Sequence, residues 1–230
     1  MKHFVILTLF KDMFSSFLNT KAIKTATDDG KIKIDLVDIR DFTTDKHRRV
    51  DFPPYGGGSG MIISCEPLSL AVDYSLNEIL NKESKKVKII YMSPRGKLLK
   101  YDLSKEISAD DFNYIIICGH YEGIDERIIE EYNVEEISIG DYVLTGGELA
   151  AEVLLDSVVR LIPGVLSDGS LDEESHTNKL LEYPQYTKPF EYRGKKVPEI
   201  LLSGNHQEIA KYRKEESIKI TKKNRPDILS

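Results

Sequence analysis

The sequence predicts an α/β domain with a mostly parallel sheet, followed by a small helical C-terminal domain. Apolar runs rich in β-branched residues recur along the chain, and several are continuous rather than alternating, which favours strands covered on both faces. Helix-like segments alternate with these runs, a pattern typical of a parallel α/β sheet. The expected strands are "HFVILTL" (3–9), "IKIDLVDI" (32–39), "VKIIYM" (87–92), "YIIIC" (114–118) and "VEEISI" (134–139).

Three segments have the apolar spacing of helices. They are "EPLSLAVDYSLNEIL" (66–80), "GIDERIIEEY" (123–132) and "GELAAEVLLDSVVRL" (147–161). The third follows a glycine-containing loop directly, so we expect a strand, a loop and a helix in succession.

The chain is expected to divide into 1–161, a flexible linker at 162–178 and a small domain at 179–230. The linker "IPGVLSDGSLDEESHTN" is rich in Ser, Gly and Asp and has no apolar periodicity, which is typical of a surface connection. The stretch "LLEYPQYTKPFEYRGKKVPEILLSG" contains too many prolines to be one helix. The segment "NHQEIAKYRKEESIKITKKNRPDIL" predicts two short basic helices, the first starting after Gly204.

Charge is spread unevenly over the 230 residues. The net charge is -6, which argues against general nucleic-acid binding by the whole molecule. Residues 203–230 nevertheless carry five Lys and two Arg against three Glu and one Asp. A basic tail permits local contact with phosphates, although clusters of Lys and Arg are more often solvated faces.

Cys65 and Cys118 are too few for a disulfide framework and lack the spacing of metal ligands, so we expect buried reduced thiols and no metal site. The apolar start of the chain is broken by Lys11 and Asp12 and has no small-residue cleavage site, which argues against a signal peptide. No run of about 18 apolar residues occurs. We therefore expect a cytoplasmic protein with no membrane contact.

Three glycine-containing loops follow three successive strands. They are "YMSPRG" (91–96), "CGHYEGIDER" (118–127) and "SIGDYVLTGGEL" (138–149). Ligands of open α/β sheets bind at the carboxyl edge of the strands, so the loops are expected to form one pocket there. Each loop alone could equally be a glycine turn needed for backbone geometry.

The chemistry of this pocket can be narrowed. There is no GxxxxGK[ST] motif for a phosphate loop and no GxGxxG after the first strand. "YGGGSGM" (55–61) follows "RRVDFPP", which is not expected to be a strand, so a turn close to a ligand or partner is the better interpretation. The three loops offer backbone groups, apolar side chains and the carboxylates of Glu122 and Asp141. That set suits a ligand that combines a neutral base with a positive charge, which indicates S-adenosylmethionine.

The motifs "FPPYGGGSGM", "YMSPRG", "GHYEGIDER", "SIGDYVLTGGELA" and "RLIPGVL" occur in this order. The chain resembles the bacterial tRNA (guanine-N1)-methyltransferases of the SPOUT class over nearly its whole length. The resemblance implies a deep trefoil knot and a homodimer with a shared active site. It also implies methyl transfer from S-adenosylmethionine to N1 of the guanosine immediately 3′ of the anticodon in tRNA.

The same resemblance implies site residues. Arg95 stands where the family often has glutamine. The implied cofactor-binding residues are Tyr91, Ser93, Pro94, Gly96, Gly119, Tyr121, Glu122, Gly123, Ile139, Gly140, Asp141, Tyr142, Val143, Leu144, Gly146 and Gly147.

Two residues are expected to act on the acceptor base. N1 of guanine carries a proton at neutral pH, so a base must remove it and a cation should stabilise the charge that develops on O6. The resemblance implies Glu174 as the base and Arg160 as the cation, with Asp172 and Glu173 as alternatives to Glu174. From sequence alone, Arg160 could equally cap the last turn of a helix.

The basic tail supplies Lys211, Arg213 and Lys214 as candidate tRNA phosphate contacts. Two alternatives stay open. One is a SPOUT methyltransferase that acts on another RNA position, and the other is a non-catalytic RNA-binding protein that keeps a cofactor pocket.

Overall fold

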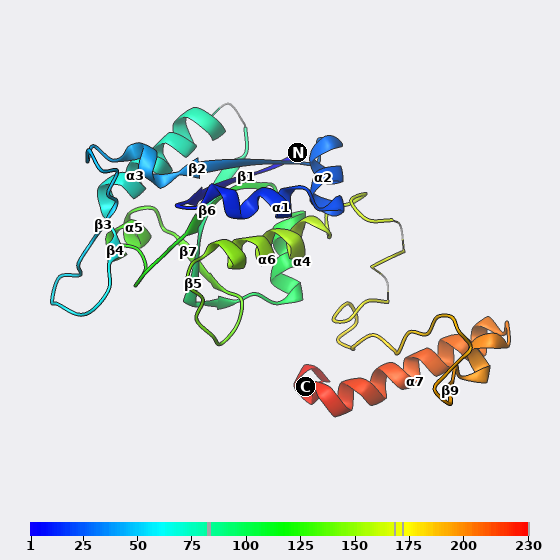
Figure 1. Ribbon diagram of the computed structural model, residues 1–230. Helices are drawn as coiled ribbons and strands as arrows, with labels where there is room; N and C mark the ends of the chain where they lie inside the picture. Colours follow the sequence, from blue (N-terminus) through cyan, green and yellow to red (C-terminus); the bar gives the residue numbers. More distant parts are fainter. Residues whose placement is uncertain (82–83, 168, 172, 230) are drawn as a thin grey trace. The chain divides into compact units, whose positions relative to one another are not determined.

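The computed structural model describes residues 1–81, 84–167, 169–171 and 173–229, and the chain forms two compact units, Met1–Leu166 and Ser167–Ser230 (Figure 1). The division comes within the segment expected to link two domains. Among the described residues, no helix is both long enough and apolar enough to cross a membrane.

A five-stranded sheet forms the centre of the first unit. Its order is β2-β1-β6-β5-β7 and every neighbouring pair is parallel. The prediction of an α/β fold with a mostly parallel sheet is confirmed. β1 is buried along its whole length, as its continuous apolar sequence predicts. The strands are β1 (Lys2–Thr8), β2 (Ile32–Asp38), β5 (Lys86–Leu98), β6 (Phe112–Cys118) and β7 (Glu135–Ser138).

Successive side chains of each strand point to opposite faces of the sheet, and the apolar ones form two hydrophobic cores. Helices cover both faces (Figure 1). Phe4 and Ile6 of β1 share one core with helices α1 (Phe14–Leu18), α2 (Lys21–Asp28), α4 (Tyr101–Ala109) and α6 (Glu148–Val159). Val5 and Leu7 share the other with α3 (Cys65–Tyr74), its π-helical continuation Ser75–Leu80, and α5 (Glu126–Glu131). Short 3₁₀ helices occur at Lys11–Met13 and Ile39–Phe42.

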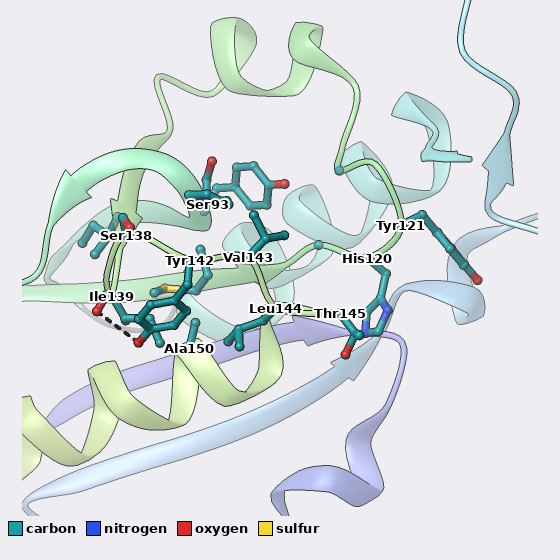
Figure 2. A pocket seen from close by; sticks show the side chains of 18 of the residues that line it. Ser93, His120, Tyr121, Ser138, Ile139, Tyr142, Val143, Leu144, Thr145 and Ala150 are labelled. Atoms are coloured by element: carbon teal, nitrogen blue, oxygen red, sulfur yellow. Dashed lines mark hydrogen bonds between the residues drawn. The ribbon is translucent and has the colours of Figure 1, made fainter. Parts of the chain in front are cut away.

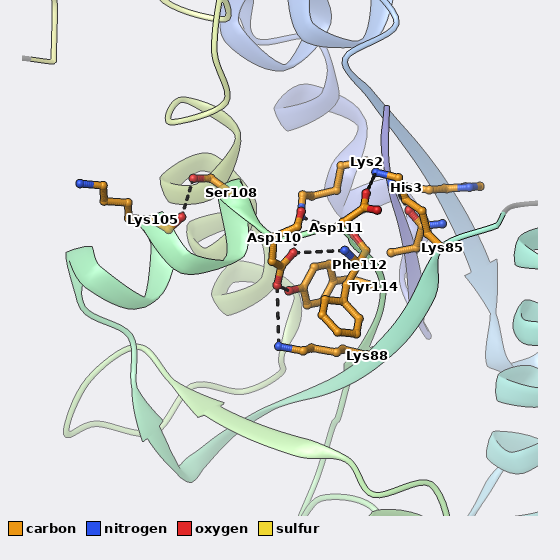
Figure 3. A network of polar contacts seen from close by, with 11 residues as sticks. Lys2, His3, Lys85, Lys88, Lys105, Ser108, Asp110, Asp111, Phe112 and Tyr114 are labelled. Atoms are coloured by element: carbon orange, nitrogen blue, oxygen red, sulfur yellow. Dashed lines mark hydrogen bonds and ion pairs between the residues drawn. The ribbon is translucent and has the colours of Figure 1, made fainter.

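A polar cluster around Asp110 joins the central strands at the amino edge of the sheet (Figure 3). The Lys2 ammonium lies 2.6 Å from Asp110 Oδ1, and the hydroxyl of buried Tyr114 donates to the same carboxylate. Burial lowers the pKa of Lys2, whereas burial and the Asp110 hydrogen bond raise the pKa of Tyr114. Lys88 of β5 adds a longer contact of 3.7 Å to Asp110, so three strands are joined at this end.

Two local expectations in the first unit are wrong. A two-residue strand, β3 (Asp51–Phe52), precedes the glycine loop and pairs antiparallel with β4 (Ile62–Ile63) beyond it. β5 does not end at Met92 but continues to Leu98. Its register against β7 shifts between Met92 and Lys97, so residues 93–96 bulge out of the ladder instead of forming a terminal loop.

The second unit contains one long helix where two short ones were expected. α7 (His206–Asn224) begins at the N-cap Asn205, whose side chain accepts from the Glu208 amide, and no Pro or Gly interrupts it. A 3₁₀ turn at Pro226–Leu229 follows. The proline-rich stretch before it forms a small hairpin, β8 (Glu191–Tyr192) and β9 (Lys195–Lys196), and a 3₁₀ turn at Glu199–Leu202.

Candidate functional site

A cleft opens where the three glycine-containing segments meet, at the carboxyl ends of β6 and β7 and at the bulge of β5 (Figure 2). Its volume is about 200 Å³. The predicted cofactor residues that line it are Tyr91, Ser93, Pro94, Gly119, Tyr121, Glu122, Gly123, Ile139, Gly140, Tyr142, Val143, Leu144, Gly146 and Gly147.

Two predicted cofactor residues do not line the cleft. Asp141 is exposed on the third loop, outside the lining. Gly96 faces the neighbouring strand, because a Cβ there would lie 2.4 Å from the backbone of Glu136 and Ile137. The close approach of β5 to β7 therefore requires glycine at position 96. The sequence had left open that these glycines serve backbone geometry and not a ligand, and this explanation applies to Gly96.

The second and third loops cross at their glycines. The Gly147 amide donates to the Gly119 carbonyl at 2.8 Å. A Cβ at Gly147 would lie 2.8 Å from the Cα of Cys118, and one at Gly119 would lie 2.8 Å from the Tyr91 ring. These distances leave no room for side chains, so the glycines bring the backbones of the loops together as the wall of the cleft.

A buried carboxylate connects this crossing to the first strand. Glu148, the first residue of α6, is only 1% exposed; its Oε1 accepts from the Thr8 hydroxyl at 2.7 Å and its Oε2 lies 2.8 Å from His120 Nε2. His120 also packs against the Phe10 ring at 4.7 Å.

Sequence reasoning missed His120, which lines the cleft, and Glu148, which holds it. Their partnership joins residues far apart in the chain, so spacing could not indicate it. A carboxylate just inside a helix start is usually read as a favourable first-turn charge.

The side chains at the mouth of the cleft are apolar and exposed (Figure 2). Tyr142 and Val143 are 54% and 80% exposed, and the Tyr142 hydroxyl donates to the Ile139 carbonyl at 3.3 Å. Tyr121 adopts a left-handed backbone conformation with φ of 58°, which costs free energy in a residue with a side chain. Such strain gathers at ligand sites, and these rings offer flat surfaces to a planar ligand.

The charges around the cleft suit a cation. Among the described residues that line it there is no Lys or Arg, and Glu122 contributes a carboxylate. Burial, with the nearby Glu136 carboxylate, raises the pKa of the Tyr91 hydroxyl, so Tyr91 stays neutral at pH 7. Among the described residues, no group of His, Cys, Asp or Glu is arranged to hold a metal ion.

Cys118 is buried, as expected, and burial followed by the Glu148 charge raises the pKa of its thiol. Cys65, which was also expected to be buried, is instead half-buried beside Asp125.

The glycine loop 55–61 packs against the cleft. The Glu122 amide donates to the Met61 carbonyl at 3.0 Å, and a Cβ at Gly60 would lie 2.5 Å from the Glu122 side chain. Arg95 is directed elsewhere: it pairs with Glu126 at 3.0 Å and Glu136 at 3.2 Å. These carboxylates raise its pKa, and it contributes to a neighbouring groove instead of the cleft.

Comparison with known proteins decides the family. The family model described as tRNA (Guanine-1)-methyltransferase TrmD matches residues 1–230. The chain belongs to this tRNA (guanine-N1)-methyltransferase family. A tRNA (guanine-N(1)-)-methyltransferase from Ruminiclostridium cellulolyticum is 51% identical over 228 residues, 99% of this chain and 96% of that protein. Proteins of the same name from Treponema denticola and Caldicellulosiruptor saccharolyticus are 50% and 48% identical, covering 98% and 99% of this chain and 90% of each relative.

Arg160, the cation expected to act on the acceptor base, does not line the cleft of the first unit. Arg160 follows the last residue of α6 and is half-buried. Because a helix rises about 1.5 Å per residue, Arg160 lies roughly 18 Å along the axis from Glu148 at the cleft. The structure therefore does not bring Arg160 to the cleft of its own chain.

The remaining predicted residues belong to the second unit and are described within it. Glu174 is half-buried in a turn, where its carbonyl accepts from the Thr177 amide at 3.3 Å. Lys211 and Lys214 are exposed on α7. Arg213 is half-buried and contacts its own unit, and the alternative base Asp172 lies outside the described residues.

Proposed function

We propose that this protein transfers a methyl group from S-adenosylmethionine to N1 of the guanosine immediately 3′ of the anticodon in tRNA. The observation that carries the proposal is the cleft at the carboxyl edge of the sheet, in a chain of the tRNA (guanine-N1)-methyltransferase family. Its backbone walls, apolar rings and single carboxylate match a neutral nucleoside that carries a sulfonium, and they do not match a pyrophosphate.

The cleft residues bind and orient the donor in this proposal. Backbone groups from Ile139 to Leu144 recognise the adenine, since amides and carbonyls crossing at glycines can approach a ligand closely. Glu122 faces the positive end of the molecule. The donor supplies an activated methyl group, so what remains for the protein is to align it with N1 and exclude water.

Two side chains prepare the acceptor. We propose that the Glu174 carboxylate accepts the N1 proton as the new N–C bond forms, and that the Arg160 guanidinium stabilises the negative charge on O6. The Glu174 side chain is one methylene longer than an aspartate side chain. Its carboxylate can therefore reach the N1 proton from a backbone position slightly further away.

A second copy of the chain completes the site in this proposal. Arg160 lies roughly 18 Å of helix rise from its own cleft, so a homodimer with a shared active site would let the Arg160 of one copy serve the cleft of the other. Exposed Leu149 and Val153 on α6 support an apolar interface next to the cleft. Light scattering should give the mass of a dimer, and Val153→Asp should shift it toward that of a monomer.

We also propose the trefoil knot of the family. The close crossing of Gly147 over the backbone of Cys118 and Gly119 supports it, because one segment passes directly against another there. The first unit is then the knotted catalytic domain, and the linker expected at 162–178 connects it to the second unit.

The second unit is proposed to hold the tRNA. Exposed Lys211 and Lys214 on α7 contact phosphates and set the position of the RNA without reading its sequence. Since the substrate is tRNA, we propose that the protein acts in the cytoplasm.

Methyl transfer to unmodified tRNA tests the proposal. A tRNA with guanosine after the anticodon should be methylated, and nucleoside mass spectrometry should find 1-methylguanosine; the same tRNA with adenosine there should not react. Methylation of a ribose or of another position would favour a different SPOUT activity. Binding of tRNA without any transfer would favour the non-catalytic alternative. Glu174→Gln should abolish transfer and leave the Kd for S-adenosylmethionine nearly unchanged, and an active variant would exclude Glu174 as the base.

A further inference from the structure

Arg213 differs from the other basic residues of α7 in what it contacts. Its Cζ lies 4.7 Å from the centre of the Tyr183 ring, and its Nη1 lies 3.5 Å from Glu173 Oε2. Lys211 and Lys214, on the same helix, are exposed. Arg213 thus contacts residues of its own unit, although the sequence predicted a contact with tRNA phosphate.

Tyr183 completes this group. Its hydroxyl donates to the same Glu173 oxygen at 2.5 Å. Burial, and then the Glu173 contact, raise the pKa of Tyr183, so the phenol keeps its proton and stays the donor. One carboxylate oxygen therefore receives an aromatic hydroxyl and a guanidinium from two separate parts of the unit.

The geometry at Arg213 favours stacking over solvent contact. Within the part of the chain that the structure describes, its Nε is buried and has no hydrogen-bond partner. An unpaired buried donor costs free energy. The guanidinium lies against the Tyr183 ring, and the side chain as a whole is 38% exposed.

Glu173 directly precedes Glu174, so holding its carboxylate restrains the backbone that carries the proposed base. The same turn is secured by Thr177 Oγ1, which donates to the Leu171 carbonyl at 3.0 Å. The Glu182 amide donates to Ser175 Oγ at 2.9 Å. Residues 173–180 thus form turns and bends, and this segment is attached to α7 by Arg213 and by the Leu181 amide, which donates to Thr221 Oγ1 at 2.8 Å.

We propose that Arg213 is a positioning residue for methyl transfer: with Tyr183 it holds Glu173, so that the adjacent Glu174 is presented to the target base. This inference rests on the proposed function, in which Glu174 removes the N1 proton. It also gives Glu173 a positioning role in place of the role of an alternative base, because its Oε2 receives both the Tyr183 hydroxyl and the Arg213 guanidinium. A displacement of about 1 Å can slow a reaction by up to about 100-fold, so loosening this group is expected to act on the rate.

The test separates positioning from phosphate binding. Tyr183→Phe removes one oxygen, and Arg213→Lys keeps the charge but loses the planar stack. Both variants should lower the single-turnover rate at saturating tRNA about tenfold or more, while the Kd for tRNA and its salt dependence stay at the wild-type values. The matched control, Lys219→Ala, removes an exposed charge from the same helix and should keep the wild-type rate.

Three results are decisive. If Arg213→Ala instead weakens tRNA binding, lowers the salt slope by about one and leaves the saturating rate unchanged, Arg213 is a phosphate contact and the inference is overturned. If the wild-type protein methylates tRNA and Tyr183→Phe matches it, the positioning role fails although the proposed function stands. If the wild-type protein transfers no methyl group, the proposed function itself fails. Thermal melts of Tyr183→Phe confirm that a slower rate does not reflect unfolding.

Discussion

Replacement of Glu148 by alanine should loosen the first unit at the cleft. The carboxylate is buried and holds two partners, the Thr8 hydroxyl at 2.7 Å and His120 Nε2 at 2.8 Å. Removing the carboxylate leaves the Thr8 hydroxyl and His120 Nε2 without this partner, and a buried polar group left unsatisfied costs about 1–3 kcal/mol. We therefore expect Glu148→Ala to lower the free energy of unfolding by about 2–4 kcal/mol.

Urea unfolding followed by circular dichroism measures this loss, with two further variants for comparison. Glu148→Gln keeps the length of the side chain and an acceptor for Thr8, so it should cost only about 1 kcal/mol. Asp156→Ala removes an exposed carboxylate from the same helix and should stay within about 0.5 kcal/mol of wild type. If Glu148→Ala is as stable as Asp156→Ala, the buried network does not hold the loops, and the reasoning is wrong.

Three further changes test other parts of the structure. Gly147→Ala places a Cβ 2.8 Å from neighbouring backbone; it should cost about 1–3 kcal/mol in urea unfolding and weaken S-adenosylmethionine binding in calorimetry, whereas Asp156→Ala, an exposed change on α6, should leave that affinity unchanged. Asp125→Ala removes the N-cap of α5 and should lower stability by about 1 kcal/mol; Asp125→Asn keeps the cap, so a loss of equal size at pH 7 would contradict the capping role. Tyr114 has a raised pKa in the folded chain, whereas an unfolded tyrosine has a pKa of about 10. The stabilisation from Tyr114 is therefore fully present below about pH 10. It is lost as pH rises above about 10, because only the unfolded chain then releases the phenol proton. Tyr114→Phe should therefore lose less stability than wild type between pH 10 and 11 in urea titrations, and parallel losses would exclude the effect.

Much of the fold could be predicted because its signal is local. β1 and β6 are continuous apolar runs, and such runs indicate strands with two covered faces. The helices α1, α2 and α4 were not anticipated; in α2 only Ile23 and Ala26 are buried, so few apolar residues mark its inner face. The bulge at residues 93–96 depends on pairing with β7, which sequence reasoning had no means to register.

The candidate site divides in the same way. The glycine-containing loops predicted that a cleft would form at the sheet edge, because parallel strands present their carboxyl ends together, and the structure has a cleft there. The bond between His120 and Glu148 joins residues 28 positions apart, and nothing local indicates it. Gly96 was assigned to the cofactor, but packing against β7 explains it, since a turn and a close approach both require glycine.

A calorimetric titration with S-adenosylmethionine tests the cleft most directly. We expect saturable binding to the wild-type protein, with affinity weakened in Gly147→Ala and retained in Asp156→Ala. An absence of binding heat over a range of temperatures, with the protein folded by circular dichroism, would contradict a donor site at this edge of the sheet.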